Sequence, residues 1–186
     1  MIKHSSLAMF VTVLLAVAAV AQQHRRDPLT DLEVDKIRDT ARLPEERLKL
    51  YIEFARARLD KLQQVRSDPK ATDREKQMHD SLQDFLDIYD ELNSNVDTFA
   101  DRGSDLRKAL KPVIEADTEF GSKLRAFKSE TAGNREQAQQ YEFLLGSALE
   151  ATDAAAKDHR ELLAEQEVTF KNKKKQDRKE SARHSE

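Results

Sequence analysis

DREKQMHDSLQDFLDIYDELNSNVDTFADR, residues 73–102, is the stretch of sequence that decides the fold. Its apolar side chains recur at alternating spacings of 4 and 3 residues, at Met78, Leu82, Phe85, Tyr89, Leu92, Val96 and Phe99. Such a repeat, kept over three heptads, is typical of a helix that buries one stripe of side chains against other helices. The stripe indicates how the chain packs and says nothing about chemistry.

Three other segments, residues 44–67, 104–129 and 134–171, carry similar stripes. Their members are Leu48, Ile52, Ala55, Leu59 and Leu62; Leu106, Leu110, Val113, Phe120, Leu124 and Phe127; and Tyr141, Leu144, Leu145, Ala148, Leu149, Ala155, Ala156, Leu162, Leu163, Gln166 and Phe170. Because short turns separate the segments, sequence neighbours are expected to be antiparallel neighbours. We predict an all-α fold, an elongated antiparallel up-down-up-down four-helix bundle with a short extra N-terminal helix at residues 30–42.

Local signals predict where the helices begin and end. Thr30 and Thr72 each precede a glutamate by three residues, which is the pattern of a capping box. Pro44 fits a first helical turn, where its missing amide hydrogen costs nothing, and Gly103 fits a helix C-terminus. Pro112 is expected to kink the third long helix, because it removes a backbone hydrogen bond there.

The composition excludes several classes of protein. Of 186 residues, 38% are hydrophobic and 36% are charged, with only 4 Gly and 4 Pro. A β-sandwich or β-barrel needs many more turn residues, so the composition favours long, thin helices. The chain has no cysteine, which excludes disulfides, thiolate metal sites and a cysteine nucleophile.

Residues 1–21 have the features of a signal peptide. Lys3 precedes an apolar run from Leu7 to Ala21 that only Thr12 interrupts, and the run ends in Ala19-Val20-Ala21. We expect cleavage after Ala21 and export to the periplasm or the extracellular space, with no transmembrane span remaining. The alternative is a retained anchor, although the run is short for a span of about 20 residues.

The mature chain is divided into three parts. Residues 22–29 are expected to be a flexible lead-in, residues 30–172 the helical bundle domain, and residues 173–186 a disordered basic tail. Residues 171–186 hold seven Lys or Arg and three acidic residues, so this tail could contact an anionic surface. Cleavage before Gln22 would also place His24 third from a free amine, a pattern that can bind Cu(II) or Ni(II).

Polar residues interrupt the stripes at three places. Asp117 lies on the third long stripe, and Thr152 and His159 lie on the fourth. They could form a buried polar site, or they could pair with other side chains and fix the helix register. Small residues from Ala148 to Ala156 either allow close helix packing or leave room for a ligand.

No recognised catalytic motif is present. The sequence has no H-E-x-x-H pair, no E-x-x-H on a helix and no glycine-rich phosphate loop, so we predict no catalytic residue, no cofactor and no enzyme activity. The expected function is a secreted or periplasmic interaction protein of the chaperone, adaptor or scaffold type. The alternative is a ligand- or metal-binding bundle with an internal site near Asp117, Ala155 and His159. We expect a protein partner or self-association, for which Leu86 and Ile88 off the stripe are available, and no nucleic acid.

Overall fold

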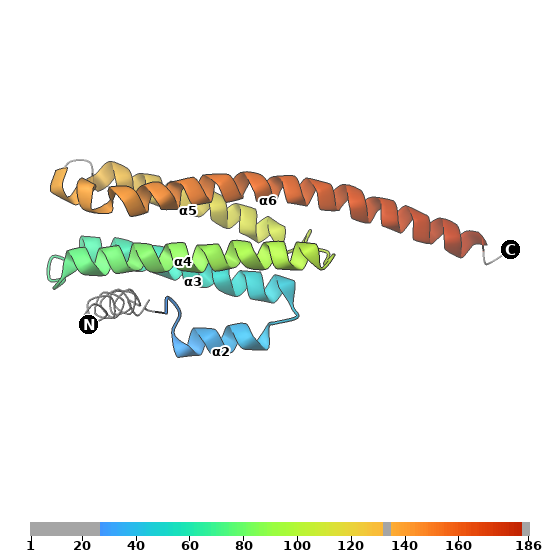
Figure 1. Cartoon of the computed structure of the whole chain (residues 1–186), viewed down its shortest axis with the longest axis horizontal. Helices are drawn as coiled ribbons and strands as arrows, with labels where there is room; N and C mark the ends of the chain where they lie inside the picture. The colour runs from blue at the N-terminus through green and yellow to red at the C-terminus, as the bar shows by residue number, and fades with distance from the viewer. Residues whose placement is uncertain (1–26, 132–134, 184–186) are drawn as a thin grey trace, which may run out of the picture.

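The computed structural model describes residues 27–131 and 135–183, and all regular structure within these ranges is helical (Figure 1). The elements are α2 (Asp31–Asp39), α3 (Pro44–Ser67), α4 (Arg74–Asp101), α5 (Leu110–Thr131) and α6 (Arg135–Arg183). The long helices pack as a bundle, so the predicted all-α class is confirmed. The expected signal peptide, His24 and most of the lead-in lie outside the described residues.

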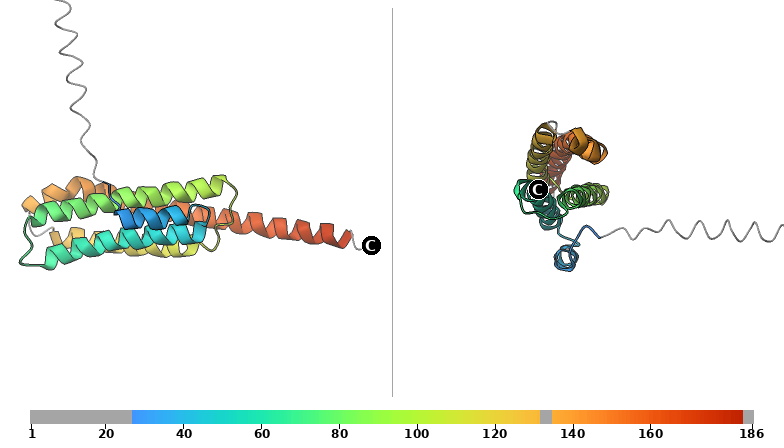
Figure 2. Two further views of the ribbon diagram at one scale, coloured as in Figure 1. Left: turned by 90° about the horizontal axis from the view of Figure 1, so that it is seen from below. Right: turned by 90° about the vertical axis from the view of Figure 1, so that its left-hand side faces the viewer.

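The four long helices form two helical hairpins, α3 with α4 and α5 with α6 (Figures 1 and 2). The hairpins pack together through α3 beside α5 and α4 beside α6. In the described part of the chain, α4 and α5 make no close backbone approach, although they are consecutive. The expectation that sequence neighbours are spatial neighbours is therefore wrong for this pair, because residues 102–109 carry the chain diagonally across the end of the bundle.

Three of the four predicted stripes are buried throughout, whereas four members of the fourth are only partly buried: Leu149, Leu162, Leu163 and Phe170. Every member of the stripes on α3 and α4 is buried, and so are those of the third stripe, from Leu106 to Phe127. Burial of each large apolar side chain contributes about 1.5–3 kcal/mol to the free energy of unfolding. Leu86 and Ile88 are buried as well, so the suggestion that they lie free for self-association is wrong.

The helix ends confirm part of the predicted capping. Thr30 and Glu33 form a capping box, with the Glu33 amide donating to the Thr30 hydroxyl and the Thr30 amide donating to the Glu33 carboxylate. Thr72 forms no such box, because Asp73 precedes α4 with a φ of 49° and makes no side-chain cap. Gly103 does follow α4 with a φ of 69°, as a C-terminal glycine should.

The third long helix begins later than predicted. Residues 104–109 are not helical, and α5 starts at Leu110, so Pro112 lies in its first turn and removes no hydrogen bond. The expected kink at Pro112 is therefore wrong. Leu106 remains buried, and its amide donates to Oε1 of Gln166 on α6, at 2.7 Å. This side chain supplies the acceptor for a buried amide that precedes α5.

Helix α6 continues to Arg183, where the sequence predicted a disordered tail over residues 173–186. Residues 171–183 contain no Gly or Pro and consist mostly of good helix formers such as Lys, Arg, Gln and Glu. The C-terminal part of α6 projects beyond the end of the bundle (Figure 1). None of the helices in the described ranges has the length and apolar character that crossing a bilayer requires.

Candidate functional site

Asp117 is the centre of a buried polar group that joins three helices. Its carboxylate lies on α5 with 2% of the residue exposed. The Tyr89 hydroxyl on α4 donates to Oδ1 at 2.7 Å, and Nδ1 of His159 on α6 lies 2.9 Å from Oδ2. Asp117 and His159, which the sequence singled out separately, are therefore in direct contact.

The group has a defined arrangement of hydrogens. A carboxylate only accepts hydrogen bonds, so we assign the ring hydrogen of His159 to Nδ1. In the neutral ring, Nε2 is then an acceptor. Burial raises the pKa of Tyr89, and the neighbouring Asp117 charge raises it further, so the phenol stays protonated as a donor. Both carboxylate oxygens thus have a partner, as a buried charge requires.

The structure includes Tyr89 in this group and excludes Thr152. The Thr152 hydroxyl is buried but donates to the carbonyls of Ala148 and Leu149 on its own helix. Tyr89 was assigned to the apolar stripe, although a buried phenol needs a partner for its hydroxyl. That requirement was the signal in the sequence that could have identified it.

A groove of about 650 Å³ runs between α4 and α6 and reaches His159. Ala151, Ala154 and Ala155 contribute small side chains to its lining, so the alanine-rich part of α6 leaves space beside α4. The full lining is Asn93, Asp97, Ala100, Asp101, Ala151, Ala154, Ala155, Asp158, His159 and Leu162. The predicted site residues His159 and Ala155 line this groove, while Asp117 lies behind His159.

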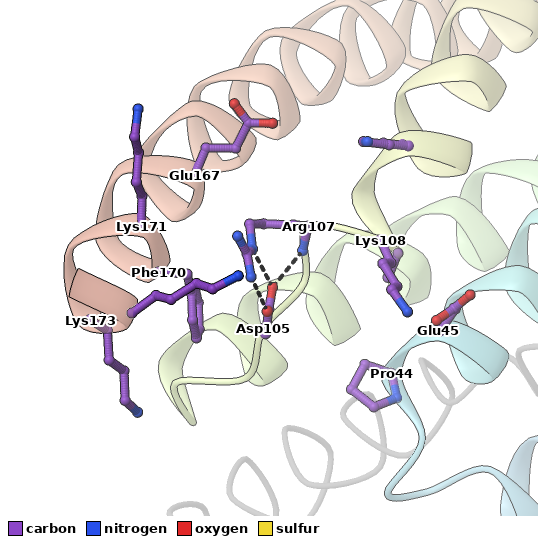
Figure 3. A pocket seen from close by; sticks show the side chains of 12 residues that line it. Pro44, Glu45, Asp105, Arg107, Lys108, Glu167, Phe170, Lys171 and Lys173 are labelled. Atoms are coloured by element: carbon purple, nitrogen blue, oxygen red, sulfur yellow. Dashed lines mark hydrogen bonds and ion pairs between the residues drawn. The ribbon is translucent and has the colours of Figure 1, made fainter. Parts of the chain in front are cut away.

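A second cleft, of about 910 Å³, lies where α6 leaves the bundle (Figure 3). Its charged lining has six basic and three acidic side chains: Arg107, Lys108, Lys111, Lys171, Lys173, Lys174, Glu45, Asp105 and Glu167. We call this site the basic cleft. The sequence shows the basic run that begins at Lys171 but does not reveal the cleft, because such a composition is typical of a disordered tail, whereas α6 is helical there.

Arg107 organises the basic cleft. Its guanidinium donates from Nε and from a terminal nitrogen to the Asp105 carboxylate, at 2.9 and 2.6 Å, and lies 5.0 Å from the centre of the Phe170 ring (Figure 3). The hydrogen bonds from Arg107 lower the pKa of Asp105 and keep it ionised. The connection 102–109 is thereby linked to α6 at the point where the helix leaves the bundle.

Among the described residues, no group of three or more His, Asp or Glu side chains is arranged to hold a metal ion. Searches against protein-family models, curated proteins and solved structures find no match to this chain. Its function must therefore be inferred from the geometry of the groove and the basic cleft.

Proposed function

We propose that this chain is an exported, non-catalytic interaction protein of the chaperone, adaptor or scaffold type. In this proposal an elongated antiparallel up-down-up-down bundle with a short N-terminal helix presents the basic cleft to an acidic segment of a partner protein. The observation that carries the proposal is the excess of basic side chains around one cleft at the base of a projecting helix.

The charges of the cleft are available to a partner. Lys108, Lys111, Lys171, Lys173 and Lys174 form no salt bridge with any described side chain, whereas Arg107 is paired with Asp105. Like charges that line one concave surface reinforce each other's potential, which attracts an acidic partner and speeds its association. Phe170 adds partly exposed apolar surface between the charges, which suits a peptide with an apolar side chain among its carboxylates.

Charge reversal in the basic cleft tests the proposal. The double variant Lys171→Glu/Lys174→Glu is compared with Lys49→Glu/Lys128→Glu, which changes the net charge equally at two exposed lysines outside the cleft. The probe is a fluorescent peptide of glutamates around one phenylalanine, followed by anisotropy. The cleft variant should bind about tenfold more weakly than the control. Equal affinities in the two variants would reject the cleft as the binding surface.

Export is tested separately. N-terminal sequencing of the protein recovered from outside the cytoplasm should begin at Gln22 if the chain is cleaved after Ala21. A protein that keeps residues 1–21 and sediments with membranes would instead support the retained anchor.

A specific observation favours the alternative function, a ligand-binding bundle. The groove between α4 and α6 reaches His159, whose ring Asp117 holds in place, and Ala155 leaves space in front of it. NMR titration with a set of cationic, neutral and anionic small molecules would test this function. Shifts that cluster at His159 and Ala155 are expected, and no shift from any compound would reject the site.

A further inference from the structure

We propose that the groove between α4 and α6 binds a linear aliphatic amine with two or more ammonium groups. This inference rests on the ligand-binding alternative and names the chemical class of its ligand. The evidence is the chemistry of the lining, in which polar atoms that accept hydrogen bonds surround a floor of small apolar side chains.

The rim of the groove is acidic. Asp97 and Asp101 lie one turn apart on α4, and Asp158 faces them from α6. These three carboxylates form no salt bridge with a described side chain, and no lysine or arginine is among the described residues that line the groove. An anionic ligand would be repelled here, whereas an ammonium group carries only donors and a positive charge.

Two acceptors without partners lie deeper than the carboxylates. Oδ1 of Asn93 is buried and has no hydrogen-bond partner among the described residues. His159 is 4% exposed, and its Nδ1 is engaged by Asp117, so Nε2 points away from Asp117 and is an acceptor in the neutral ring. No described residue donates to Nε2. A buried acceptor without a donor is uncommon in a folded protein, and Oδ1 of Asn93 together with Nε2 of His159 in one groove indicates a ligand with several donors.

The shape of the groove suits a flexible chain. Asn93 and Asp101 are eight residues apart on α4, which corresponds to about 12 Å along the helix. Between them the floor consists of alanines from both helices and Leu162. Methylene groups would lie on this floor while ammonium groups at intervals reach the acceptors, and that is the pattern of an aliphatic polyamine. A metal ion fits less well, because the described residues hold no three-ligand group.

Asp117 is a positioning residue in this site. It does not line the groove, but its hydrogen bond keeps the hydrogen of His159 on Nδ1 and leaves Nε2 able to accept from an ammonium group. An asparagine at this position could still accept from Tyr89 through its oxygen. Its amide nitrogen would then donate to Nδ1 and move the ring hydrogen to Nε2, where it would face the ligand.

The first experiment titrates the full chain with spermidine at low ionic strength by calorimetry, with NMR to locate the shifts. Binding at the groove is expected, with affinity falling as salt is added. The triple variant Asp97→Asn/Asp101→Asn/Asp158→Asn should bind about tenfold more weakly, since each exposed ion pair changes affinity by roughly two- to fivefold. The matched control changes three exposed acids away from the groove and should bind as the wild type does: Asp39→Asn, Glu53→Gln and Glu142→Gln.

The second experiment uses Asp117→Asn. The ¹⁵N shifts of the His159 ring should show the hydrogen on Nε2, and spermidine affinity should fall about tenfold, the effect of losing one charge-assisted hydrogen bond. Thr152→Val is the control, because the Thr152 hydroxyl bonds only to carbonyls of its own helix. A variant with the altered tautomer and unchanged affinity would overturn the role of Nε2.

The outcomes separate this inference from the function on which it rests. If a neutral or anionic compound shifts His159 and Ala155 but spermidine does not, the site binds a ligand of another class and the amine inference is wrong. If no compound binds, the amine inference and the ligand-binding function are both wrong. If spermidine acts only by dissociating oligomers, as sedimentation would show, a second copy occupies the groove and the free-amine inference is also wrong.

Discussion

Nδ1 of His159 lies 2.9 Å from Oδ2 of Asp117, and this contact joins α6 to α5 inside the second hairpin. Tyr89 donates to the other oxygen of the same carboxylate from α4, in the first hairpin. One buried side chain therefore links both hairpins by hydrogen bonds in the middle of the core. Its removal has consequences for stability that do not depend on any ligand.

Asp117→Ala should lower the free energy of unfolding by about 2–5 kcal/mol, because the Tyr89 hydroxyl and the His159 ring both lose their partner while buried. Asp117→Asn keeps an acceptor for Tyr89 and a donor for His159, so its loss should be nearer about 1 kcal/mol. Urea unfolding measures both. Equal losses in the two variants would show that the charge, and not the hydrogen bonding, makes Asp117 important.

Two glycines should respond to alanine in opposite directions. Gly103 has a φ of 69° and no atom near the position of an added Cβ, so Gly103→Ala should destabilise by about 1 kcal/mol through backbone strain alone. Gly146 lies inside α6 with equally open surroundings, so Gly146→Ala should stabilise by about 0.5–1 kcal/mol. Thermal melting should show one decrease and one increase. Two changes of the same sign would contradict the assigned helix end.

Gln166 should be important for the start of α5. Its Oε1 accepts from the Leu106 amide at 2.7 Å, and its Nε2 donates to the Ser104 carbonyl at 3.1 Å. Gln166→Ala leaves a buried amide unpaired and should cost about 1–3 kcal/mol, with faster hydrogen exchange at Leu106. Gln166→Glu keeps an acceptor for the Leu106 amide and should protect that amide from hydrogen exchange. Equal exchange at Leu106 in the wild type and Gln166→Ala would exclude this role.

We predict that the protein is less stable in acid because Glu33 becomes protonated there. Burial acts to raise the pKa of Glu33, but hydrogen bonds from Arg58 and from the Thr30 amide outweigh it and leave the pKa below its usual 4.5. A carboxyl group whose pKa is lower in the folded state than in the unfolded state stabilises the fold at pH values above the unfolded-state pKa. This contribution to the free energy of unfolding is lost as the pH falls through the folded-state pKa. Glu33→Gln lacks this contribution. The free energies of unfolding of the wild type and the variant, measured in urea from pH 7 to pH 3, should therefore converge as the pH falls.

The exposed pair of Asp35 and Arg38 provides the control for this prediction. Their side chains are 63% and 71% exposed, so water screens the pair and it should contribute little at any pH. Asp35→Asn should therefore follow the wild type across the whole range. If the free energy of unfolding of Glu33→Gln changed with pH in parallel with that of the wild type, the link between the Glu33 pKa and stability would be contradicted.

The sequence predicted the core well because each helix stripe depends only on residues of its own helix. Leu48 and Phe120 are buried where the 4 and 3 spacing places them. The contact of Asp117 with His159 could not be predicted, since it depends on the relative register of two helices. The late start of α5 was missed for a similar reason, because the acceptor for Leu106 comes from Gln166, 60 residues away. The basic cleft was missed because local composition favoured disorder after residue 172, and α6 remains helical there.

The diagonal connection at residues 102–109 has a consequence for how the chain can be divided. Backbone contacts are dense within each hairpin and sparse between the hairpins, and this one connection joins them covalently. A break there would interrupt no long helix. Two fragments, each a complete hairpin, should therefore reassemble when mixed, and the protein would serve as a split reporter whose halves recognise each other through the core around Asp117.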